Sequence, residues 1–184
     1  MSRGNQGVDE SDGSPTAGTD RYGPPCWFAD TANVADAGIR DRFAEDWPDC
    51  WTVAGDMLDW DREYETVLNR DEGHLAWFGD GRLKPSHNCV DRHVAAGRKN
   101  AIAIRWIGAD GERESLTYLD LQHEVEAVAA ALRSLGVGPG DVVTLFMPNV
   151  PELPVTMLAC ARLGALHNVV YAGFSADELA DRHA

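Results

Sequence analysis

The chain has 184 residues, of which 44 % are apolar, and this is enough for one domain with a hydrophobic core. Its 30 acidic residues outnumber 16 basic ones, and the formal net charge of -14 argues against nucleic acid or an anionic membrane surface as a partner. We find no apolar run close to the ~20 residues of a transmembrane helix and no secretory signal, so the sequence predicts a soluble, cytoplasmic protein.

The acidic excess has two explanations, a partner-binding surface or a solvated acidic shell of the halophile type. We favour the second, because charge balance bears on solubility more than on fold. The four cysteines have no repeating spacing, which predicts reduced thiols without a disulfide framework; they are Cys26, Cys50, Cys89 and Cys160.

Residues 1–25 are rich in Gly, Ser, Asp and Pro, and we expect a disordered acidic tail, because so few apolar side chains cannot offset the entropy of ordering. From Cys26 to Trp77 the sequence becomes Trp-rich with helical spacing. Thr31 or Asn33 is placed to cap a first helix. The widely spaced aromatic residues suit anchors of a segment that wraps around a larger body, and ligand stacking is the alternative.

The cluster of His87, Cys89 and His93 raises the hypothesis of a zinc site. A structural zinc ion needs four ligands in recognisable pairs, and the sequence offers no second pair, so we predict no metal site. We expect the Asp91–His93 stretch to form capping and pairing contacts within its own neighbourhood.

Residues 101–107 predict a strand, a turn over Gly108–Gly111 follows, and residues 112–116 return as a second strand. Thr117 and Asp120 form a capping box that opens a long helix. One face of this helix is apolar at a 4, 3, 4, 3 spacing, through Leu121, Val125, Val128, Leu132 and Leu135. The glycines of segment 136–140 follow a helix and precede a strand, so we interpret them as a helix cap and a loop, not as a phosphate loop.

The stretch from Asp141 to Ser175 indicates a strand, a helix and a second strand. Its prolines, Pro151 and Pro154, fall in the first helical turn, and Gly164 ends the helix. Such a βαβ unit implies a parallel sheet with buried strands, covered on both faces.

Ser175 and Glu178 then form a capping box for one more helix, after which no strand follows. The sheet is left with few strands and an open edge, a liability for a stable domain. The fold class is therefore α/β, and the chain reads as the front part of a larger α/β protein.

Several segments together resemble the AMP-forming acetyl-CoA synthetases, or acetate–CoA ligases, of the adenylate-forming superfamily. The segments are NCVDRH (88–93), LTYLDL (116–121), LRSLGVGPGDVV (132–143), MPNVPELPVTMLACARLGA (147–165) and HNVVYAGFSADELADR (167–182). The likeness covers residue 27 to the end, more loosely before Trp77. It implies an N-terminal segment of the acetyl-CoA-synthetase type over 26–98 and the beginning of the AMP-binding domain over 99–184.

The resemblance implies a ligase that activates acetate with ATP to acetyl-adenylate and transfers the acetyl group to coenzyme A, with Mg²⁺ at the phosphates. The family's phosphate loop, acyl pocket, adenine-binding acidic residue and catalytic Lys lie beyond the point that matches Ala184. No catalytic residue is therefore carried over, and we expect the chain alone to be inactive. The rest of the adenylate-forming domain is expected in cis or as a separate chain.

One ligand contact is carried over, because Tyr171, Ala172 and Gly173 match family positions beside the adenine of coenzyme A. The alternative is a strand-to-helix turn in which Gly173 serves the backbone conformation alone. The chain departs from the family pattern at Lys84, Asn149, Asn168 and Tyr171. A propionyl-CoA or other short-chain acyl-CoA synthetase therefore stays open, as does a non-enzymatic remnant or subunit that pairs with a separately encoded remainder.

Overall fold

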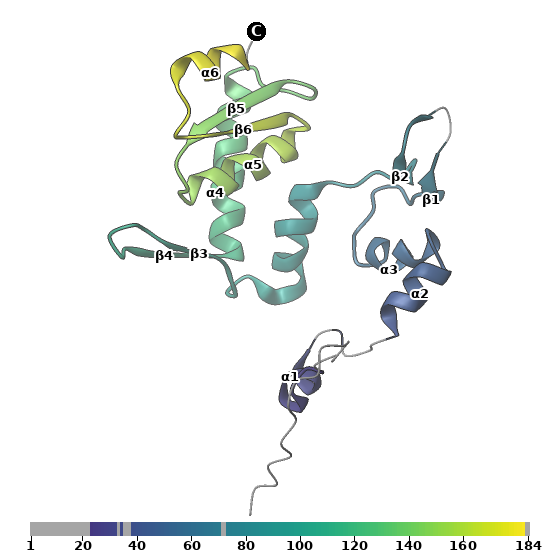
Figure 1. Ribbon diagram of the computed structural model, residues 1–184. Helices are drawn as coiled ribbons and strands as arrows, with labels where there is room; N and C mark the ends of the chain where they lie inside the picture. Colours follow the sequence, from purple (N-terminus) through teal and green to yellow (C-terminus); the bar gives the residue numbers. More distant parts are fainter. Residues whose placement is uncertain (1–22, 33, 35–37, 71–72, 183–184) are drawn as a thin grey trace, which may run out of the picture. The chain divides into compact units, whose positions relative to one another are not determined.

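The computed structural model describes residues 23–32, 34, 38–70 and 73–182. The chain divides into two compact units, residues 1–42 and 43–184. The chain contains both helices and strands, and two of the strands pair in parallel, which confirms the α/β class (Figure 1). The tail predicted for residues 1–25 lies outside the described residues except for 23–25.

The first unit contains helix α1 (Cys26–Thr31) and the start of α2 (Ile39–Glu45). Thr31 is the last residue of α1, and its hydroxyl donates to the Trp27 carbonyl oxygen at 3.0 Å. The prediction that Thr31 caps the following helix is therefore wrong, because its hydroxyl bonds back to the preceding turn instead. Asn33, the other predicted cap, lies outside the described residues.

The second unit begins with short helices and then forms a β-hairpin. A 3₁₀ turn, η1 (Asp49–Trp51), leads into α3 (Thr52–Gly55), and the strands β1 (Thr66–Asn69) and β2 (Ala76–Gly79) pair antiparallel. The sequence indicated helical character from Cys26 to Trp77 and predicted no strand there, so the hairpin corrects that prediction. Each strand has four residues, too few for an alternating pattern to stand out.

Aromatic side chains of this region contact one another in a continuous series. Ring centroids lie 5.0–6.4 Å apart, mostly edge to face, which is the favoured geometry for aromatic pairs. The series consists of Phe43, Trp47, Trp51, Trp60, Tyr64, Trp77 and Phe78. Mutual packing of the rings therefore brings together residues that are far apart in the sequence.

A helical stretch over 85–98 follows, with π-helical segments η3 (His87–Asp91) and η4 (Val94–Arg98). Strands β3 (Ile102–Ile107) and β4 (Arg113–Thr117) then form an antiparallel hairpin. Helix α4 (Tyr118–Ser134) begins at the predicted capping box, in which the Thr117 hydroxyl accepts from the Asp120 amide and the Asp120 carboxylate accepts from the Thr117 amide.

Strand β5 (Val142–Met147), helix α5 (Glu152–Leu163) and strand β6 (Leu166–Tyr171) form the predicted βαβ unit, with β5 and β6 parallel. Gly164 ends α5 at a φ of 74°, the left-handed conformation that glycine adopts without steric cost. The glycine-containing segment 136–140 lies between α4 and β5 as predicted, and the Gly140 amide donates to the Gly164 carbonyl at 3.0 Å.

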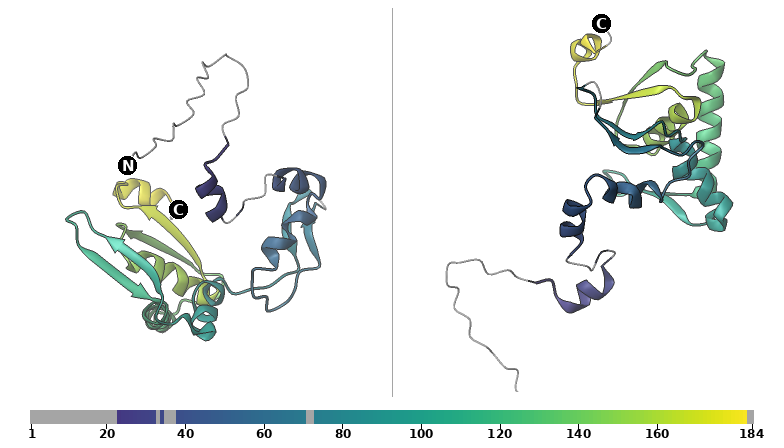
Figure 2. Two further views of the ribbon diagram at one scale, coloured as in Figure 1. Left: turned by 90° about the horizontal axis from the view of Figure 1, so that it is seen from below. Right: turned by 90° about the vertical axis from the view of Figure 1, so that its right-hand side faces the viewer.

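The main core lies between α4, α5 and the 85–98 helix. Helix α5 packs against α4 on one side and the β5–β6 sheet on the other (Figures 1 and 2). The buried residues of this core are Val90, Leu121, Val125, Ala129, Val155, Ala159, Cys160, Leu163 and Ala165. Leu135 was predicted to extend the apolar stripe of α4, but it lies after the last helical residue and is 79 % exposed.

Burial of the β5–β6 sheet is incomplete. Leu145 and Val170 are buried, whereas the paired residues Val142 and Leu166 are 64 % and 58 % exposed, and Phe146 is 43 % exposed. The prediction of buried strands covered on both faces is therefore wrong for this chain. Within the part of the chain that the structure describes, the sheet has only two strands, so both edges are open and much apolar surface faces solvent.

Helix α6 (Ala176–Asp181) follows β6 after a turn. It begins at the predicted capping box, since the Ser175 hydroxyl accepts from the Glu178 amide at 3.3 Å and the Ser175 amide donates to the Glu178 carboxylate at 2.8 Å. In the described residues, no helix is both long and apolar enough to cross a bilayer.

Candidate functional site

The predicted contact residues Tyr171, Ala172 and Gly173 lie where β6 ends, on the rim of a pocket of about 460 Å³. Other lining residues come from the loop after β5 and the first turn of α5. The lining residues are Met147, Pro148, Asn149, Leu153, Val169, Val170, Tyr171, Ala172 and Gly173. The carboxyl ends of parallel strands are the edge at which open α/β sheets bind ligands.

Tyr171 presents an exposed aromatic face at this rim. The residue is 71 % exposed, and its ring meets the Phe174 ring edge to face at 5.9 Å between centroids. The guanidinium of Arg182 lies over the Phe174 ring, 5.1 Å from the ring centroid. An exposed aromatic ring with a guanidinium on the neighbouring ring is chemically suited to a flat, anionic ligand such as a nucleotide.

The role of Gly173 differs from the backbone role considered as an alternative above. Its φ lies outside the left-handed range, so its conformation does not require glycine. A Cβ at this position would instead lie 2.5 Å from Cε1 of Tyr171. A side chain at position 173 would therefore displace the Tyr171 ring, which lies over the turn that the Phe174 amide closes onto the Tyr171 carbonyl at 3.0 Å.

The capping box of α6 holds the far side of this turn. Hydrogen bonds from the Ser175 amide and hydroxyl to the Glu178 carboxylate lower the pKa of Glu178. The carboxylate therefore stays ionised at neutral pH and keeps the start of α6 fixed next to the pocket.

The loop wall of the pocket is held by a residue that sequence reasoning missed. The indole Nε1 of Trp106, in β3, donates to the backbone carbonyl oxygen of Asn149 at 2.7 Å. The two residues are 43 positions apart, so no local sequence pattern could predict the contact.

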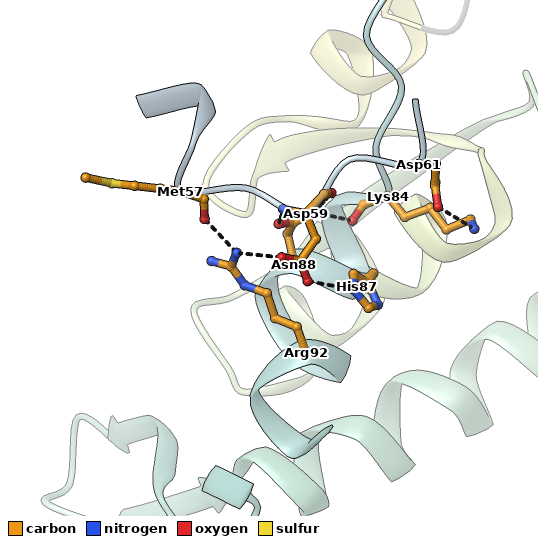
Figure 3. A network of polar contacts seen from close by, with 7 residues as sticks. All are labelled: Met57, Asp59, Asp61, Lys84, His87, Asn88 and Arg92. Atoms are coloured by element: carbon orange, nitrogen blue, oxygen red, sulfur yellow. Dashed lines mark hydrogen bonds and ion pairs between the residues drawn. The ribbon is translucent and has the colours of Figure 1, made fainter. Parts of the chain in front are cut away.

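A second group of polar contacts joins the stretch after α3 to the 85–98 helix (Figure 3). The buried Asn88 side chain accepts from the Asp59 amide at 2.8 Å and donates to the Asp59 carbonyl at 2.9 Å. Arg92 donates to the Met57 carbonyl at 2.7 Å, and His87 lies 3.0 Å from the Asp59 carboxylate. Side chains from about one turn of this helix thus supply hydrogen-bond partners for backbone groups of a segment about 30 residues earlier.

The same helix contacts the core helices through Asp91. Its carboxylate accepts from Arg162 of α5 at 2.6 Å and from Gln122 of α4 at 2.9 Å. Burial raises the pKa of Asp91, but the hydrogen bonds from Arg162 and Gln122 outweigh it, and the pKa lies below the ordinary value of 3.8. The local pairing predicted for Asp91–His93 is therefore wrong, because the helix turns these side chains toward elements distant in sequence.

The three residues of the zinc hypothesis have other neighbours. His87 contacts Asp59, the His93 ring lies 4.7 Å from that of Tyr118, and Cys89 is exposed. In the described ranges, the structure contains no group of three or more His, Cys, Asp or Glu side chains that could hold a metal ion. The described cysteines are all free thiols.

Comparison with known proteins identifies two family segments. The family "AMP-binding enzyme" matches residues 91–183, and "Acetyl-coenzyme A synthetase N-terminus" matches residues 37–89. The acetyl-coenzyme A synthetase of Rubrobacter xylanophilus is 45 % identical over 162 residues, and that of Gemmatimonas aurantiaca is 41 % identical over 164 residues. These matches cover 88 % and 89 % of this chain and 25 % of each relative.

A solved structure, the acetoacetyl-CoA synthetase from Streptomyces lividans, matches with a TM-score of 0.69 and 26 % sequence identity. The match covers 85 % of this chain and 25 % of that one. The chain thus spans about a quarter of the length of the relatives it matches. By sequence, by family segments and by fold, the chain belongs to the AMP-binding enzyme family and carries the N-terminal segment of acetyl-coenzyme A synthetases.

Proposed function

We propose that this chain is the N-terminal part of an acetate–CoA ligase. The full enzyme would join acetate to ATP, giving acetyl-adenylate and pyrophosphate, and the thiol of coenzyme A would then displace AMP. The observation that carries this proposal is the 45 % identity to an acetyl-coenzyme A synthetase over 162 residues, which extends through both family segments.

The contribution of this chain to the reaction is a contact with coenzyme A. Tyr171, Ala172 and Gly173 would lie against its adenine, with the exposed Tyr171 ring as the stacking surface. The position at the carboxyl end of β6, the adjoining pocket and the nearby Arg182 guanidinium support this assignment. ATP and its Mg²⁺ would be bound by the rest of the adenylate-forming domain, in cis or on a separate chain.

The chain alone would be inactive, because the residues that bind ATP and acetate in the family match none of its positions. The location proposed for the protein is the cytoplasm, and the acidic excess of 30 acidic over 16 basic residues would form a halophile-type solvated shell. Coverage of the exposed apolar residues Val142, Phe146 and Leu166 by the rest of the domain would complete the sheet.

Exchange of pyrophosphate into ATP tests the proposal. The chain alone should show no acetate-dependent exchange, and clear turnover would contradict its inactivity. The same chain joined to, or mixed with, the remaining three quarters of the Rubrobacter xylanophilus relative should restore exchange and acetyl-CoA formation. Failure of both arrangements, with the relative itself active, would contradict the assignment as a functional N-terminal part.

Acyl specificity is decided in the same assay by offering acetate, propionate and butyrate to the restored enzyme. Faster turnover of propionate would favour the alternative, a propionyl-CoA or other short-chain acyl-CoA synthetase.

The second alternative, a non-enzymatic subunit, predicts co-purification with a larger adenylate-forming partner from its own cells. A chain that is found only as an aggregating monomer would count against that alternative.

The coenzyme A contact is tested by calorimetric titration. Tyr171→Ala should weaken coenzyme A binding by about 5- to 150-fold, since stacking of one base on an aromatic ring contributes roughly 1–3 kcal/mol. Trp27→Ala is the matched control, because its ring is equally exposed but lies in the first unit. Equal affinities of Tyr171→Ala and the unsubstituted chain would overturn the assignment.

A further inference from the structure

The loop between β5 and α5 forms one wall of the candidate coenzyme A pocket, and little within the loop itself holds it. It contains Pro148 and Pro151, which have no backbone N–H to donate. Its internal hydrogen bonds run from the Val150 amide to the Pro148 carbonyl and from the Leu153 amide to the Val150 carbonyl. The carbonyl of Asn149, at the centre of the loop, accepts from the Trp106 indole, which belongs to a different element.

Trp106 is well placed to hold this carbonyl. The indole is half-buried, and its N–H is a donor only, so it is satisfied in one orientation of the ring. Gly108 leaves room for that orientation, because a Cβ there would lie 2.7 Å from the far edge of the ring. The 2.7 Å distance from Nε1 to the Asn149 oxygen is at the short end of the range for such bonds.

We propose that Trp106 is a positioning residue for the coenzyme A pocket. Through the Asn149 carbonyl it fixes the wall formed by Pro148 and Asn149, so that the width of the pocket depends on the β3–β4 hairpin. The ligand in this inference rests on the proposed function, whereas the effect of Trp106 on the loop does not.

The first test is hydrogen–deuterium exchange of the loop amides in Trp106→Phe, which keeps an aromatic ring and removes the donor. Exchange should become faster at residues 147, 149, 150, 152 and 153 and stay unchanged in the middle of α4. Trp60→Phe is the matched control, because it removes a similar indole bond, to the Gly55 carbonyl at 2.9 Å, in the aromatic region away from the loop. Loop exchange equal in the two variants would overturn the proposal.

A second variant guards against a general loss of structure. Gly108→Ala retains the indole and displaces it, so it should reproduce the faster loop exchange without removing a core side chain. Loop exchange unchanged in Gly108→Ala, together with uniformly faster exchange in Trp106→Phe, would show a structural role only and overturn the proposal.

The third measurement separates positioning from stability. Trp106→Phe should raise the Kd for coenzyme A by roughly 3- to 10-fold, the loss expected for one hydrogen bond, while Trp60→Phe leaves the Kd unchanged. A lower Tm with an unchanged Kd would overturn the positioning role. Absence of coenzyme A binding by the unsubstituted chain would instead overturn the ligand assignment, and the exchange comparison would still decide the effect of Trp106 on the loop.

Discussion

The carboxylate of Asp91 accepts a hydrogen bond from the guanidinium of Arg162, 71 residues further along the chain, at 2.6 Å. Both side chains are about three-quarters buried, and Arg162 also approaches Glu126 at 3.9 Å. This pair connects the 85–98 helix to α5, and α5 in turn supports the β5–β6 sheet. The packing of the 85–98 helix against α5, the helix that supports the strands of the candidate pocket, therefore depends on it.

Replacing the carboxylate should destabilise the fold. Asp91→Asn removes the charge opposite a largely buried guanidinium, and we expect the free energy of unfolding to fall by about 2 kcal/mol in a urea titration. Glu126→Gln removes a more exposed carboxylate at a longer distance from the same guanidinium and should change it by less than about 0.5 kcal/mol. Equal effects of the two substitutions on the free energy of unfolding would contradict a specific stabilising role of the Asp91–Arg162 pair.

The contribution of Asp91 should depend on pH in a defined direction. Burial raises its pKa in the folded chain, but the Arg162 and Gln122 hydrogen bonds lower it below 3.8, the ordinary value that applies in the unfolded chain. The stabilisation is therefore fully present above the unfolded pKa and is lost as the pH falls through the lower folded pKa. The difference in unfolding free energy between the unsubstituted chain and Asp91→Asn should be constant from pH 5 to 7 and shrink below about pH 4. A difference that grows on acidification would contradict this sign.

Asn88 should be essential for the attachment of the stretch after α3. Asn88→Ala leaves the Asp59 amide and carbonyl without their buried partner, and we expect a loss of about 1–3 kcal/mol with faster amide exchange around Asp59. His87→Ala removes only an exposed contact to the Asp59 carboxylate and should stay within about 0.5 kcal/mol. An Asn88→Ala chain as stable as His87→Ala would refute the role of the buried amide.

Substitution of Gly173 should change the Kd for coenzyme A more than it changes the Tm. In Gly173→Ala the new Cβ would displace the Tyr171 ring, which is exposed and free to move, so the Tm should change by only a few degrees while the Kd for coenzyme A rises. Gly138→Ala is the control, because nothing lies closer than 3.9 Å to its Cβ position. Unchanged affinity in Gly173→Ala would show that the ring position does not matter to the ligand.

Features encoded within a few residues could be predicted from the sequence. The capping boxes at Thr117 and Ser175 and the left-handed Gly164 are confirmed because their partners lie three to five positions away. The parallel pairing of β5 and β6 is also confirmed, since a short βαβ connection leaves little choice.

Contacts between distant positions could not be predicted in this way. Asp59 meets Asn88 over 29 positions and Trp106 meets Asn149 over 43, and hydrophobic periodicity carries no information about such pairs. The exposure of β5 and β6 was missed for a related reason. An apolar run indicates that a strand is suited to burial. It does not show which other elements cover the strand, and burial depends on those elements.

The two family segments meet inside one helix, since one match ends at residue 89 and the other begins at residue 91. Asn88 and Asp91 lie on either side of that boundary. Asn88 contacts Asp59 in the preceding stretch, whereas Asp91 contacts Arg162 in α5. A protease cut or a recombination point at the boundary would break the helix and separate both sets of contacts at once. Chimaeras of related synthetases should therefore exchange residues 85–98 together with both flanking segments or leave all three in place, so that the N-terminal segment and the AMP-binding domain are inherited as one unit.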